Sequence, residues 1–343
     1  MSSGPPARGE PPLVSVVVPF YDTAEFLDGC VESILAQGYE NFELILSDNR
    51  STDGSSEIAR GRAERDPRIR YVAHDEFVGQ VANYNRALTE ISPGSEYTKI
   101  VQADDWIYPE CLRKMVDLAE RHPRVGLVSS YMLDGKAIMN DGLPPEREVF
   151  TGREVCRRQL LEEAFFMGTP TTVLYRSEIV RDRTPFYPPE SLHEDTEVCY
   201  EILRDWDFGF VHQILSVARR RENSITAERR EYDPYLLDRL IQIHRFGEDF
   251  LSPRERRSVW RSQLRRYYTY LGEGLLMARG RDFWRYHRDG LATVGRRIRP
   301  LRLAAGTGRA LLELLLNPLD TGKRLVRRAA RSKPTPDPEE AEG

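Results

Sequence analysis

Two adjacent aspartates follow a short apolar run in the first third of the chain. Ile100 and Val101 end that run, and Asp104 and Asp105 come shortly after it, ahead of an aromatic residue and Pro109. Burying two neighbouring carboxylates is costly unless a cation or hydrogen-bond donors compensate their charge. Mg²⁺ and Mn²⁺ take oxygen ligands and commonly share them with substrate phosphates, so the pair predicts a metal site. The alternative is a solvated turn that caps a helix beginning near Pro109.

The elements around this pair alternate between strands and helices. Apolar and β-branched runs predict strands at 13–20, 42–46, 69–72 and 97–101. Apolar residues at helical spacing predict helices from about residue 23, at 55–64 and at 81–91. Such an order indicates βαβ units in a parallel sheet with right-handed crossovers. Ligands bind these sheets beyond the carboxyl ends of the strands, where polar loops follow at 19–22, 47–54 and 102–106.

Several other classes of protein are disfavoured. No G-x-G-x-x-G follows the first strand and no Walker A loop is present, which argues against a dinucleotide or P-loop site. The four cysteines are widely spaced and form no C-x-x-C pair, so free thiols in a reducing compartment are expected. The N-terminal residues lack the apolar core of a signal peptide, and no apolar run is long enough to span a membrane. These features together predict a cytoplasmic protein.

Three sequence motifs resemble those of a known enzyme family. They are Val-Ser-Val-Val-Val-Pro-Phe-Tyr-Asp at 14–22, Ser-Asp-Asn-Arg-Ser-Thr-Asp-Gly-Ser at 47–55 and Gln-Ala-Asp-Asp-Trp-Ile-Tyr-Pro at 102–109. In order and spacing they resemble the nucleotide-sugar half of family 2 glycosyltransferases, over roughly residues 13–131. Three motifs in register are far more specific than one. The resemblance implies the GT-A fold, a Rossmann-like, mostly parallel α/β sheet flanked by helices.

The resemblance also implies an activity and a donor site. The activity would be an inverting transfer of a sugar from a nucleotide diphosphate-sugar, with a UDP-sugar favoured and dTDP- or GDP-sugars as alternatives. Asp105 would ligate Mg²⁺ or Mn²⁺, and Asp104 would contact the ribose. The nucleobase would lie beside Asp48 and Asn49, with a wall formed by Pro19, Phe20 and Tyr21.

A second pair of acids, Glu194 and Asp195, opens a helix expected to run to about Arg204. One interpretation is an N-terminal turn in which acids interact favourably with the helix dipole. By the resemblance, Asp195 would instead be the general base that deprotonates the acceptor hydroxyl, with Glu194 orienting it or contacting the acceptor. The resemblance favours the second interpretation.

An arginine-rich segment follows the strand expected at 208–218. Family members commonly carry Arg-x-His-x-x-Ser-x-Thr here, near the diphosphate, and this chain matches at Arg219, Ser224 and Thr226. Arg221 stands where His is usual. Arg219, Arg221 and Ser224 are therefore candidate diphosphate contacts, with an ordinary solvated arginine face as the alternative.

Two departures from the family pattern affect the donor site. Gln102 replaces an Asp that often opens the metal motif, and this predicts weaker metal binding. Asn49 replaces the second Asp of the nucleobase motif, which adds a donor and predicts an altered base preference. The acids expected to act in the reaction are retained.

Charge divides the chain unevenly. Residues 296–333 hold 11 Lys and Arg against 2 Asp and Glu, a net +9, so the rest of the chain sums to −13. A basic tail on an acidic body points to an anionic surface and not to nucleic acid. Beyond Pro318, basic and apolar residues fall on opposite helix faces, which suits an anionic membrane. Packing on the chain itself or in a homodimer is the alternative.

These observations predict a domain order and leave rival functions open. A disordered leader at 1–12 precedes a catalytic domain at 13–230, with a nucleotide-sugar half at 13–131 and an acceptor half at 132–230. A helical region at 231–331 and a disordered tail at 332–343 follow. The acceptor would be a glycan, glycolipid or lipid-linked saccharide, as in polysaccharide or cell-envelope biosynthesis. The rivals are a non-catalytic membrane-associated scaffold and a sugar nucleotidyltransferase, which would need a Gly-rich loop after the first strand.

Overall fold

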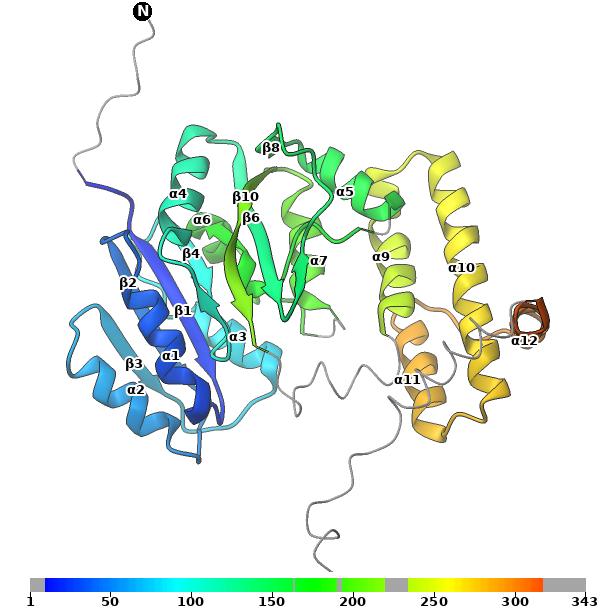
Figure 1. Ribbon diagram of the computed structural model, residues 1–343, viewed down its shortest axis with the longest axis horizontal. Coiled ribbons are helices and arrows are strands. Elements are labelled where there is room, and N and C mark those ends of the chain that lie inside the picture. The colour runs from blue at the N-terminus through cyan, green and yellow to red at the C-terminus, as the bar shows by residue number, and fades with distance from the viewer. Residues whose placement is uncertain (1–9, 163, 190–192, 220–233, 317–343) are drawn as a thin grey trace, which may run out of the picture. The chain divides into compact units, whose positions relative to one another are not determined.

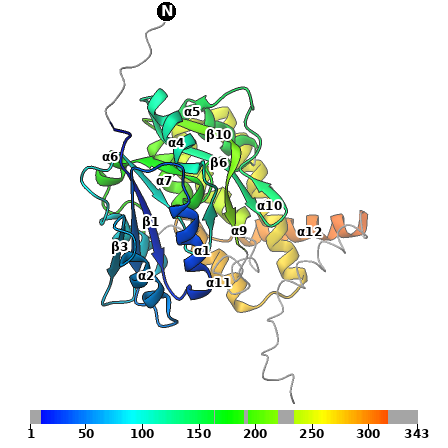
Figure 2. The same ribbon diagram turned by 60° about the vertical axis from the view of Figure 1, so that its left-hand side comes forward.

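The computed structural model describes residues 10–162, 164–189, 193–219 and 234–316. The chain divides into two compact units, residues 1–220 and 221–343. The expected end of the catalytic domain at residue 230 lies outside the described residues. Figures 1 and 2 show the helices and strands of both units.

The first unit is built on one ten-stranded sheet. Its main path runs, in spatial order, through β3 (Ile69–Ala73), β2 (Phe42–Asp48), β1 (Val14–Phe20), β4 (Tyr97–Ile100), β9 (Leu174–Arg176), β6 (Val125–Asp134), β10 (Asp207–Ala218) and β5 (Trp106–Ile107). Two short strands lie off this path, β7 (Ala137–Met139) against β6 and β8 (Val149–Phe150) against β10.

The first four strands pair in parallel, as their alternation with helices predicted. In that register Phe20 lies opposite Asp48, so the strands β1 and β2 end side by side. The second half of the sheet is mixed, because β9 runs antiparallel to both β4 and β6. Before β9, Pro170–Thr172 forms a 3₁₀ turn. Thr171 of this turn bonds to the carboxylate of Asp105.

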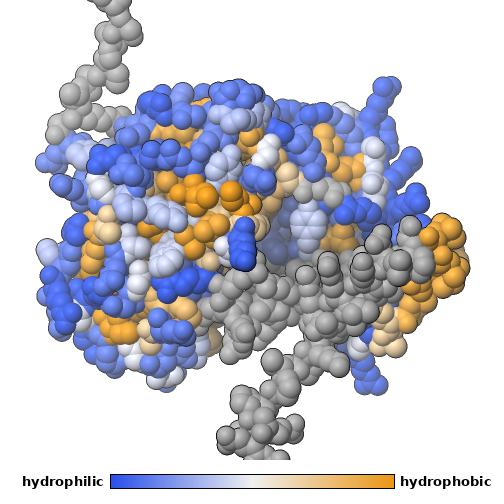
Figure 3. All heavy atoms as spheres, viewed as in Figure 1, coloured by the Kyte–Doolittle hydropathy of each residue, from blue (hydrophilic) through white to orange (hydrophobic). Residues whose placement is uncertain are grey.

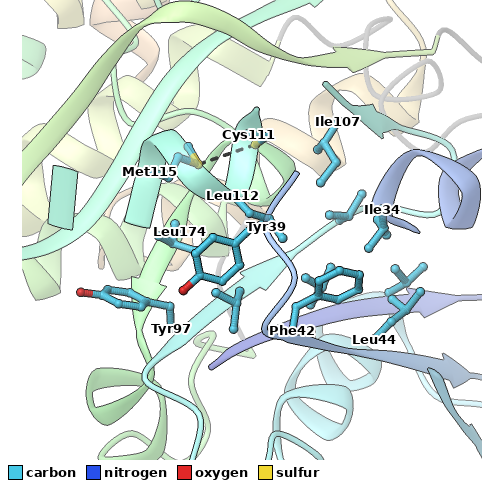
Figure 4. Packing of buried hydrophobic residues seen from close by; sticks show 14 of the residues in the cluster. Ile34, Tyr39, Phe42, Leu44, Tyr97, Ile107, Cys111, Leu112, Met115 and Leu174 are labelled. Atoms are coloured by element: carbon cyan, nitrogen blue, oxygen red, sulfur yellow. Dashed lines mark hydrogen bonds between the residues drawn. The ribbon is translucent and has the colours of Figure 1, made fainter. Parts of the chain in front are cut away.

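Helices cover the sheet of the first unit (Figures 1 and 2). They are α1 (Ala24–Leu35), α2 (Ser55–Ala63), α3 (Gln80–Leu88), α4 (Cys111–Arg121), α5 (Gly152–Glu162), α6 (Ser177–Arg181) and α7 (Glu194–Ile202). α1 and α4 bury apolar stripes against the strands, and Ile34, Leu44 and Met115 belong to one core cluster (Figure 4). Close packing of this core fixes the ends of the strands, and these ends carry the candidate site.

The second unit is helical, as its apolar spacing predicted. It contains α9 (Pro234–Phe250), α10 (Pro253–Leu276), α11 (Arg281–Ala292) and α12 (Pro300–Leu316). A capping box starts α10, in which the side chains of Ser252 and Glu255 bond to each other's backbone N–H groups. Phe283 and His287 are buried, so aromatic residues of this unit serve packing. Among the described residues no helix is long and apolar enough to cross a membrane.

Candidate active site at the carboxyl ends of the strands

The loops after β1 and β2 are bonded to each other. Asp22 accepts a hydrogen bond from the backbone N–H of Thr52 at 2.7 Å, and its own N–H donates to the hydroxyl of Ser51 at 3.1 Å. Asp53 accepts from the N–H of Ala24, at the start of α1, at 2.9 Å. The two polar loops therefore adjoin each other beyond the parallel strands, at the carboxyl edge where the sheet topology predicted them.

Asp48 is buried at the end of β2, and its carboxylate is well supplied with donors. One oxygen accepts from the N–H of Ser51 at 2.8 Å. The other accepts from the hydroxyl of Tyr71 at 2.9 Å and from that of Ser56. These bonds hold the carboxylate in a fixed orientation at the edge of the sheet.

The amide of Asn49 binds the loop between β3 and α3. Its Nδ2 donates to the carbonyl of Val78 at 2.8 Å, and its Oδ1 accepts from the N–H of Val78 at 3.0 Å. The same Oδ1 accepts from Arg86 at 2.7 Å. Asn49 is 2% exposed, so its side chain is chiefly engaged with protein groups. The predicted contact of Asn49 with a base edge stays a prediction.

The predicted wall of the nucleobase pocket contains both buried and exposed rings. Pro19 and Phe20 are buried, and Phe20 is part of the core cluster. Tyr21 is exposed, and its ring centroid lies 4.7 Å from that of Phe77, which is also exposed. Tyr21 and Phe77 thus form an aromatic pair that is open to solvent, close to Asn49 and Val78. Phe20, the last residue of β1, instead packs in the core.

Asp105 lies in a nearly enclosed environment. Its Oδ2 accepts from the hydroxyl of Thr171 at 2.5 Å. Burial raises the pKa of Asp105 to about 7; the Thr171 hydrogen bond lowers it, and the neighbouring charge of Asp104 raises it. Beneath Thr171, the buried ammonium of Lys99 donates to its carbonyl at 2.7 Å. The 3₁₀ turn therefore presents a hydroxyl directly to the carboxylate of Asp105.

Gln102 connects the same loop to α3. Its Nε2 donates to the hydroxyl of Tyr84 at 3.2 Å, and its backbone N–H donates to the hydroxyl of Thr171 at 3.1 Å. An aspartate at this position would have no N–H to offer Tyr84. The uncharged Gln102 side chain thus connects the 102–106 loop to Tyr84.

Asp195 lies in the first turn of α7. Its Oδ1 accepts from the N–H of Thr196 at 2.7 Å. Although the residue is partly exposed, its carboxyl group is deep enough that burial raises its pKa; the charge of His193 and the bonds from Thr196 lower it. Glu194 shares that first turn. A carboxylate with a raised pKa has the greater proton affinity that a general base needs.

Tyr187 and Asn85 join the segment before Asp195 to α3. Asn85 donates to the carbonyl of Tyr187 at 2.8 Å and accepts from its N–H at 2.7 Å. The rings of Tyr84 and Tyr187 lie 6.1 Å apart. Burial raises the pKa of Tyr187, and the charge of Asp195 raises it further.

These contacts bring the two predicted acid pairs to one region of the first unit. Burial raises the pKa of the Tyr84 hydroxyl, and the charges of Asp104 and Glu194 both add to this effect. Tyr84 thus bonds to Gln102 of the 102–106 loop, and its ring lies 6.1 Å from that of Tyr187, in the segment before α7. Within the described part of the chain no three His, Cys, Asp or Glu residues form a metal cluster. Any cation here would need ligands from substrate or water as well.

Arg219 is the one predicted diphosphate contact that the structure describes. Its guanidinium carbon lies 4.5 Å from the ring centroid of Trp106 and 5.6 Å from that of Phe26. Its backbone and its charge both lower the pKa of Asp105. Arg221, Ser224 and Thr226 lie outside the described residues. Arg219 therefore places its guanidinium beside Trp106, the residue after Asp105, and its contact with a diphosphate stays a prediction.

Sequence reasoning missed the residues that hold these loops together. They are Tyr84, Asn85, Arg86, Thr171 and Tyr187. The available signal was the run Asn-Tyr-Asn-Arg on the predicted helix after the third strand, where polar residues interrupt the apolar spacing. A surface hollow of about 630 Å³ between α4 and β10 contains none of the predicted site residues.

Comparisons with known proteins agree with this arrangement. Residues 15–184 match the model of the family described as Glycosyl transferase family 2. The chain carries a family 2 glycosyltransferase domain. It is 36% identical over 119 residues to glycosyltransferase GlyG of Streptococcus pneumoniae, covering 35% of this chain and 39% of GlyG. The chain thus spans about two fifths of that relative's length.

Solved structures support the GT-A fold of the domain. TarS of S. aureus (residues 1–349), in complex with UDP-GlcNAc, superposes with a TM-score of 0.58 at 17% identity, covering 82% of this chain and 81% of that one. The mannosyltransferase PcManGT of Pyrobaculum calidifontis, in complex with GDP-Man and Mn²⁺, gives 0.55 at 19% identity, covering 94% and 85%. At these identities the likeness concerns the fold alone.

Proposed function

We propose that this chain transfers a sugar from a nucleotide diphosphate-sugar to a hydroxyl group of a glycan, glycolipid or lipid-linked saccharide, with inversion at the anomeric carbon. The observation that carries the proposal is the position of Tyr84, which bonds to Gln102 in the loop of Asp104 and Asp105 and packs near Tyr187, ahead of Glu194 and Asp195, in a family 2 domain. A UDP-sugar is the favoured donor. TarS with UDP-GlcNAc and PcManGT with GDP-Man show this fold with such donors, and dTDP-sugars remain an alternative.

The residues at the end of β4 fit a divalent cation. Asp105 is buried with a raised pKa beside a second carboxylate, a combination that an added positive charge would stabilise. One carboxylate ligand completed by diphosphate oxygens and water matches a common way in which Mg²⁺ is bound. Asp105 would ligate Mg²⁺ or Mn²⁺, with Asp104 on the ribose side. When bound, the cation would act as a Lewis acid that stabilises charge on the diphosphate.

Each nucleotide-facing residue has a proposed task. Asp48 and Asn49 orient the base, and Tyr21 provides an apolar surface for it, with Pro19 and Phe20 fixing the position of that loop. Arg219 contacts the diphosphate and offsets the charge that develops on it. Among the predicted diphosphate contacts, Arg221 and Ser224 keep the same proposed role.

Asp195 has the proposed role of general base. Its carboxylate accepts the proton of the acceptor hydroxyl while the oxygen attacks the anomeric carbon from the face opposite the diphosphate. A new carbon–oxygen bond forms, the bond to the diphosphate breaks, and the nucleoside diphosphate leaves with the bonding electrons. Glu194 orients Asp195 or contacts the acceptor. A single displacement inverts the configuration and needs no covalent intermediate.

Some proposed partners depend on residues outside the described ranges. The basic amphipathic segment 318–331 would bind an anionic membrane surface, or would pack within a homodimer. The proposed setting is cytoplasmic and peripheral to the inner face of a membrane. No nucleic acid is expected as a partner.

A donor panel tests the proposal. The full-length protein is incubated with UDP-, GDP- and dTDP-sugars and Mn²⁺, and released nucleoside diphosphate is measured. Turnover of one donor that is lost in Asp105→Ala supports the enzyme. Absence of donor binding and turnover, with Asp105→Ala indistinguishable from the wild type, would favour a non-catalytic scaffold. Release of pyrophosphate from a nucleoside triphosphate would favour a nucleotidyltransferase.

A further inference from the structure

The inner side of α12 is fixed against α10 by glycines. A Cβ atom on Gly306 would lie 1.9 Å from the carbonyl oxygen of Tyr268, and one on Gly272 would lie 2.5 Å from the backbone nitrogen of Thr307. Neither distance is compatible with a side chain, so the two helix backbones touch at this crossing. Arg309 adds a hydrogen bond to the hydroxyl of Thr269 at 3.1 Å. The rotation of α12 about its axis is therefore set by contacts within the second unit.

The opposite side of α12 is exposed and contains no polar residue. At about 100° per residue, eight residues share a stripe roughly 140° wide along the helix. They are Leu301, Ala304, Ala305, Gly308, Leu311, Leu312, Leu315 and Leu316. We call the five leucines of this stripe the leucine face; Leu301 is 87% exposed, and Leu315 and Leu316 are each 70% exposed. Figure 3 shows apolar colour along the right-hand edge, where Figure 1 places α12.

Basic residues flank the leucine face. Arg296, Arg297 and Arg299 precede α12, Arg302 lies in its first turn, and all four are exposed. Glu313 is the only acid in the helix. An exposed apolar stripe of this extent is unusual on a monomeric soluble protein and marks an interaction surface. The arginines beside the leucine face favour a partner that is apolar where it meets the leucines and negatively charged where it meets the arginines.

We propose that α12 lies on the surface of an anionic lipid bilayer, with the leucine face among the acyl chains. A helix with one fully apolar side and basic flanking residues lies in the plane of the interface, its apolar side buried about 5–10 Å. The four arginines then lie at the depth of the anionic headgroups, and each adds electrostatic attraction. The helix rests on the bilayer, since no described helix can cross one.

The charge distribution argues against the other occupants. In a homodimer built on the leucine face, two copies of the arginine cluster at the start of α12 would repel each other unless the helices ran antiparallel. The chain after residue 316 offers little apolar cover. It contains only Leu319, Leu325 and Val326 as large apolar residues, among six Lys and Arg. An anionic lipid surface provides acyl chains for the leucine face and negatively charged headgroups for the arginines.

Vesicle co-sedimentation of the full-length protein tests this inference. Vesicles of phosphatidylcholine alone are compared with vesicles of phosphatidylcholine and phosphatidylglycerol. The test variant combines Leu301→Ser, Leu311→Ser, Leu312→Ser and Leu315→Ser, all at exposed positions that leave the glycine crossing intact. The matched control combines Ile138→Ser and Met139→Ser, which removes exposed apolar side chains from the first unit.

We expect the wild type and the matched control to bind the anionic vesicles, and the leucine-face variant to bind at least about tenfold more weakly. Replacing Arg296, Arg297 and Arg299 by Gln lowers binding to anionic vesicles and reduces its dependence on salt. The leucine-face variant retains residues 317–343, so its loss of binding cannot be attributed to the basic segment.

Three outcomes would overturn the inference. The first is a wild type that binds neither kind of vesicle. The second is a leucine-face variant that binds as well as the wild type. The third is a wild type that is dimeric by light scattering, becomes monomeric in the leucine-face variant and ignores vesicles, which would assign the face to a second copy. Donor turnover is measured separately, and its absence would leave the membrane result unaffected.

Discussion

Asn49 and Val78 are joined by two hydrogen bonds, one from each end of the Asn49 amide. Nδ2 donates to the carbonyl of Val78 at 2.8 Å, and Oδ1 accepts from its N–H at 3.0 Å. The Asn49 side chain thereby pairs with the Val78 backbone through one donor and one acceptor, as a neighbouring strand would, and it holds the loop that contains Phe77. A carboxylate could accept from the N–H but could not donate to the carbonyl. The asparagine that departs from the family pattern thus has a structural task in this chain.

Asn49→Asp is expected to weaken donor binding more than it slows the reaction. The change leaves the Val78 carbonyl without its donor and brings a negative charge close to it, which costs about 1–3 kcal/mol of stability. Because the loop with Phe77 loosens, the KM for the donor rises while kcat changes less. Urea unfolding and steady-state kinetics with varied donor measure the two effects.

The matched control is Asn41→Asp, which makes the same chemical change at a surface position. Asn41 Nδ2 donates to the carbonyl of Pro11 at 2.7 Å in an exposed setting. Its replacement should change stability by no more than about 0.5 kcal/mol and leave the donor KM unaltered. Equal effects of the two variants would contradict a positioning role for Asn49.

Asp195→Asn is expected to abolish transfer while nucleotide affinity stays close to that of the wild type. Removing a general base typically lowers kcat by about 10²–10⁴-fold. Calorimetric titration with the nucleoside diphosphate and Mn²⁺ gives the affinity, and glycoside formation gives kcat. Glu194→Gln, one residue away in the same helical turn, serves as the comparison and should have a smaller effect on kcat. A parallel loss of nucleotide binding in Asp195→Asn would refute the assignment.

The pH dependence of kcat follows from the environment of Asp195. Burial raises the pKa of its carboxyl group, so the base loses its charge at a higher pH than an ordinary aspartate does. Activity should fall on acidification through that raised pKa. For stability the sign is opposite: a folded-state pKa above the unfolded one stabilises the protein at low pH, and this contribution is lost as pH rises through the folded value. Asp195→Asn should therefore unfold at an equal or higher temperature than the wild type at neutral pH.

The positions of the predicted donor-binding residues in the fold could be read from the sequence, because each follows a strand that its own local sequence pattern predicts. β1 and β2 are rich in apolar and β-branched residues, and β4 ends at Ile100 just ahead of Val101. The polar residues that follow each of these strands were expected at the carboxyl edge of the sheet. Asp48, Asp104 and Asp105 were located from such runs together with the family motifs. Their placement needed no knowledge of distant contacts.

The residues that hold the site loops in place, such as Thr171 and Asn85, act through contacts between segments far apart in the chain. Thr171 bonds to Asp105 across 66 positions, and Asn85 bonds to Tyr187 across 102 positions. The strand β9 pairs through only a few residues with β4 and β6, too short a stretch to produce a periodic signal. Such pairings follow from the packing of the whole unit, which no local pattern encodes.

Asp104 and Asp105 should be separable by their effects on metal and donor. Asp105→Asn is expected to remove Mn²⁺ binding in the presence of nucleotide and to lower kcat by about a hundredfold or more, since charge on the leaving diphosphate loses its main stabilisation. Asp104→Asn should raise the donor KM but retain Mn²⁺ binding. Electron paramagnetic resonance of bound Mn²⁺ distinguishes the two. Retention of full Mn²⁺ affinity in Asp105→Asn would contradict its role as ligand.

Asn85→Ala is expected to slow the reaction by loosening the segment that precedes Asp195. Its amide forms two hydrogen bonds with the backbone of Tyr187, the residue whose hydroxyl is influenced by the charge of Asp195. Losing both bonds should destabilise the fold by about 1–3 kcal/mol and let the segment before the base shift. A displacement of about 1 Å at a reacting group can cost up to about a hundredfold in rate. Accordingly, kcat should fall while the donor KM stays nearly constant.

Glu43→Ala provides the stability-matched control for that variant. Glu43 holds Ser92 through two hydrogen bonds of 2.8 Å, from its N–H and from its hydroxyl, but it lies near the amino end of β2, away from the site. A comparable fall in unfolding temperature without a fall in kcat would show that instability alone does not slow the enzyme. Asn85→Asp keeps the acceptor for the Tyr187 N–H and should lie between Asn85→Ala and the wild type. If Asn85→Ala and Glu43→Ala lowered kcat equally, the effect would be general destabilisation and Asn85 would have no specific role in placing Asp195.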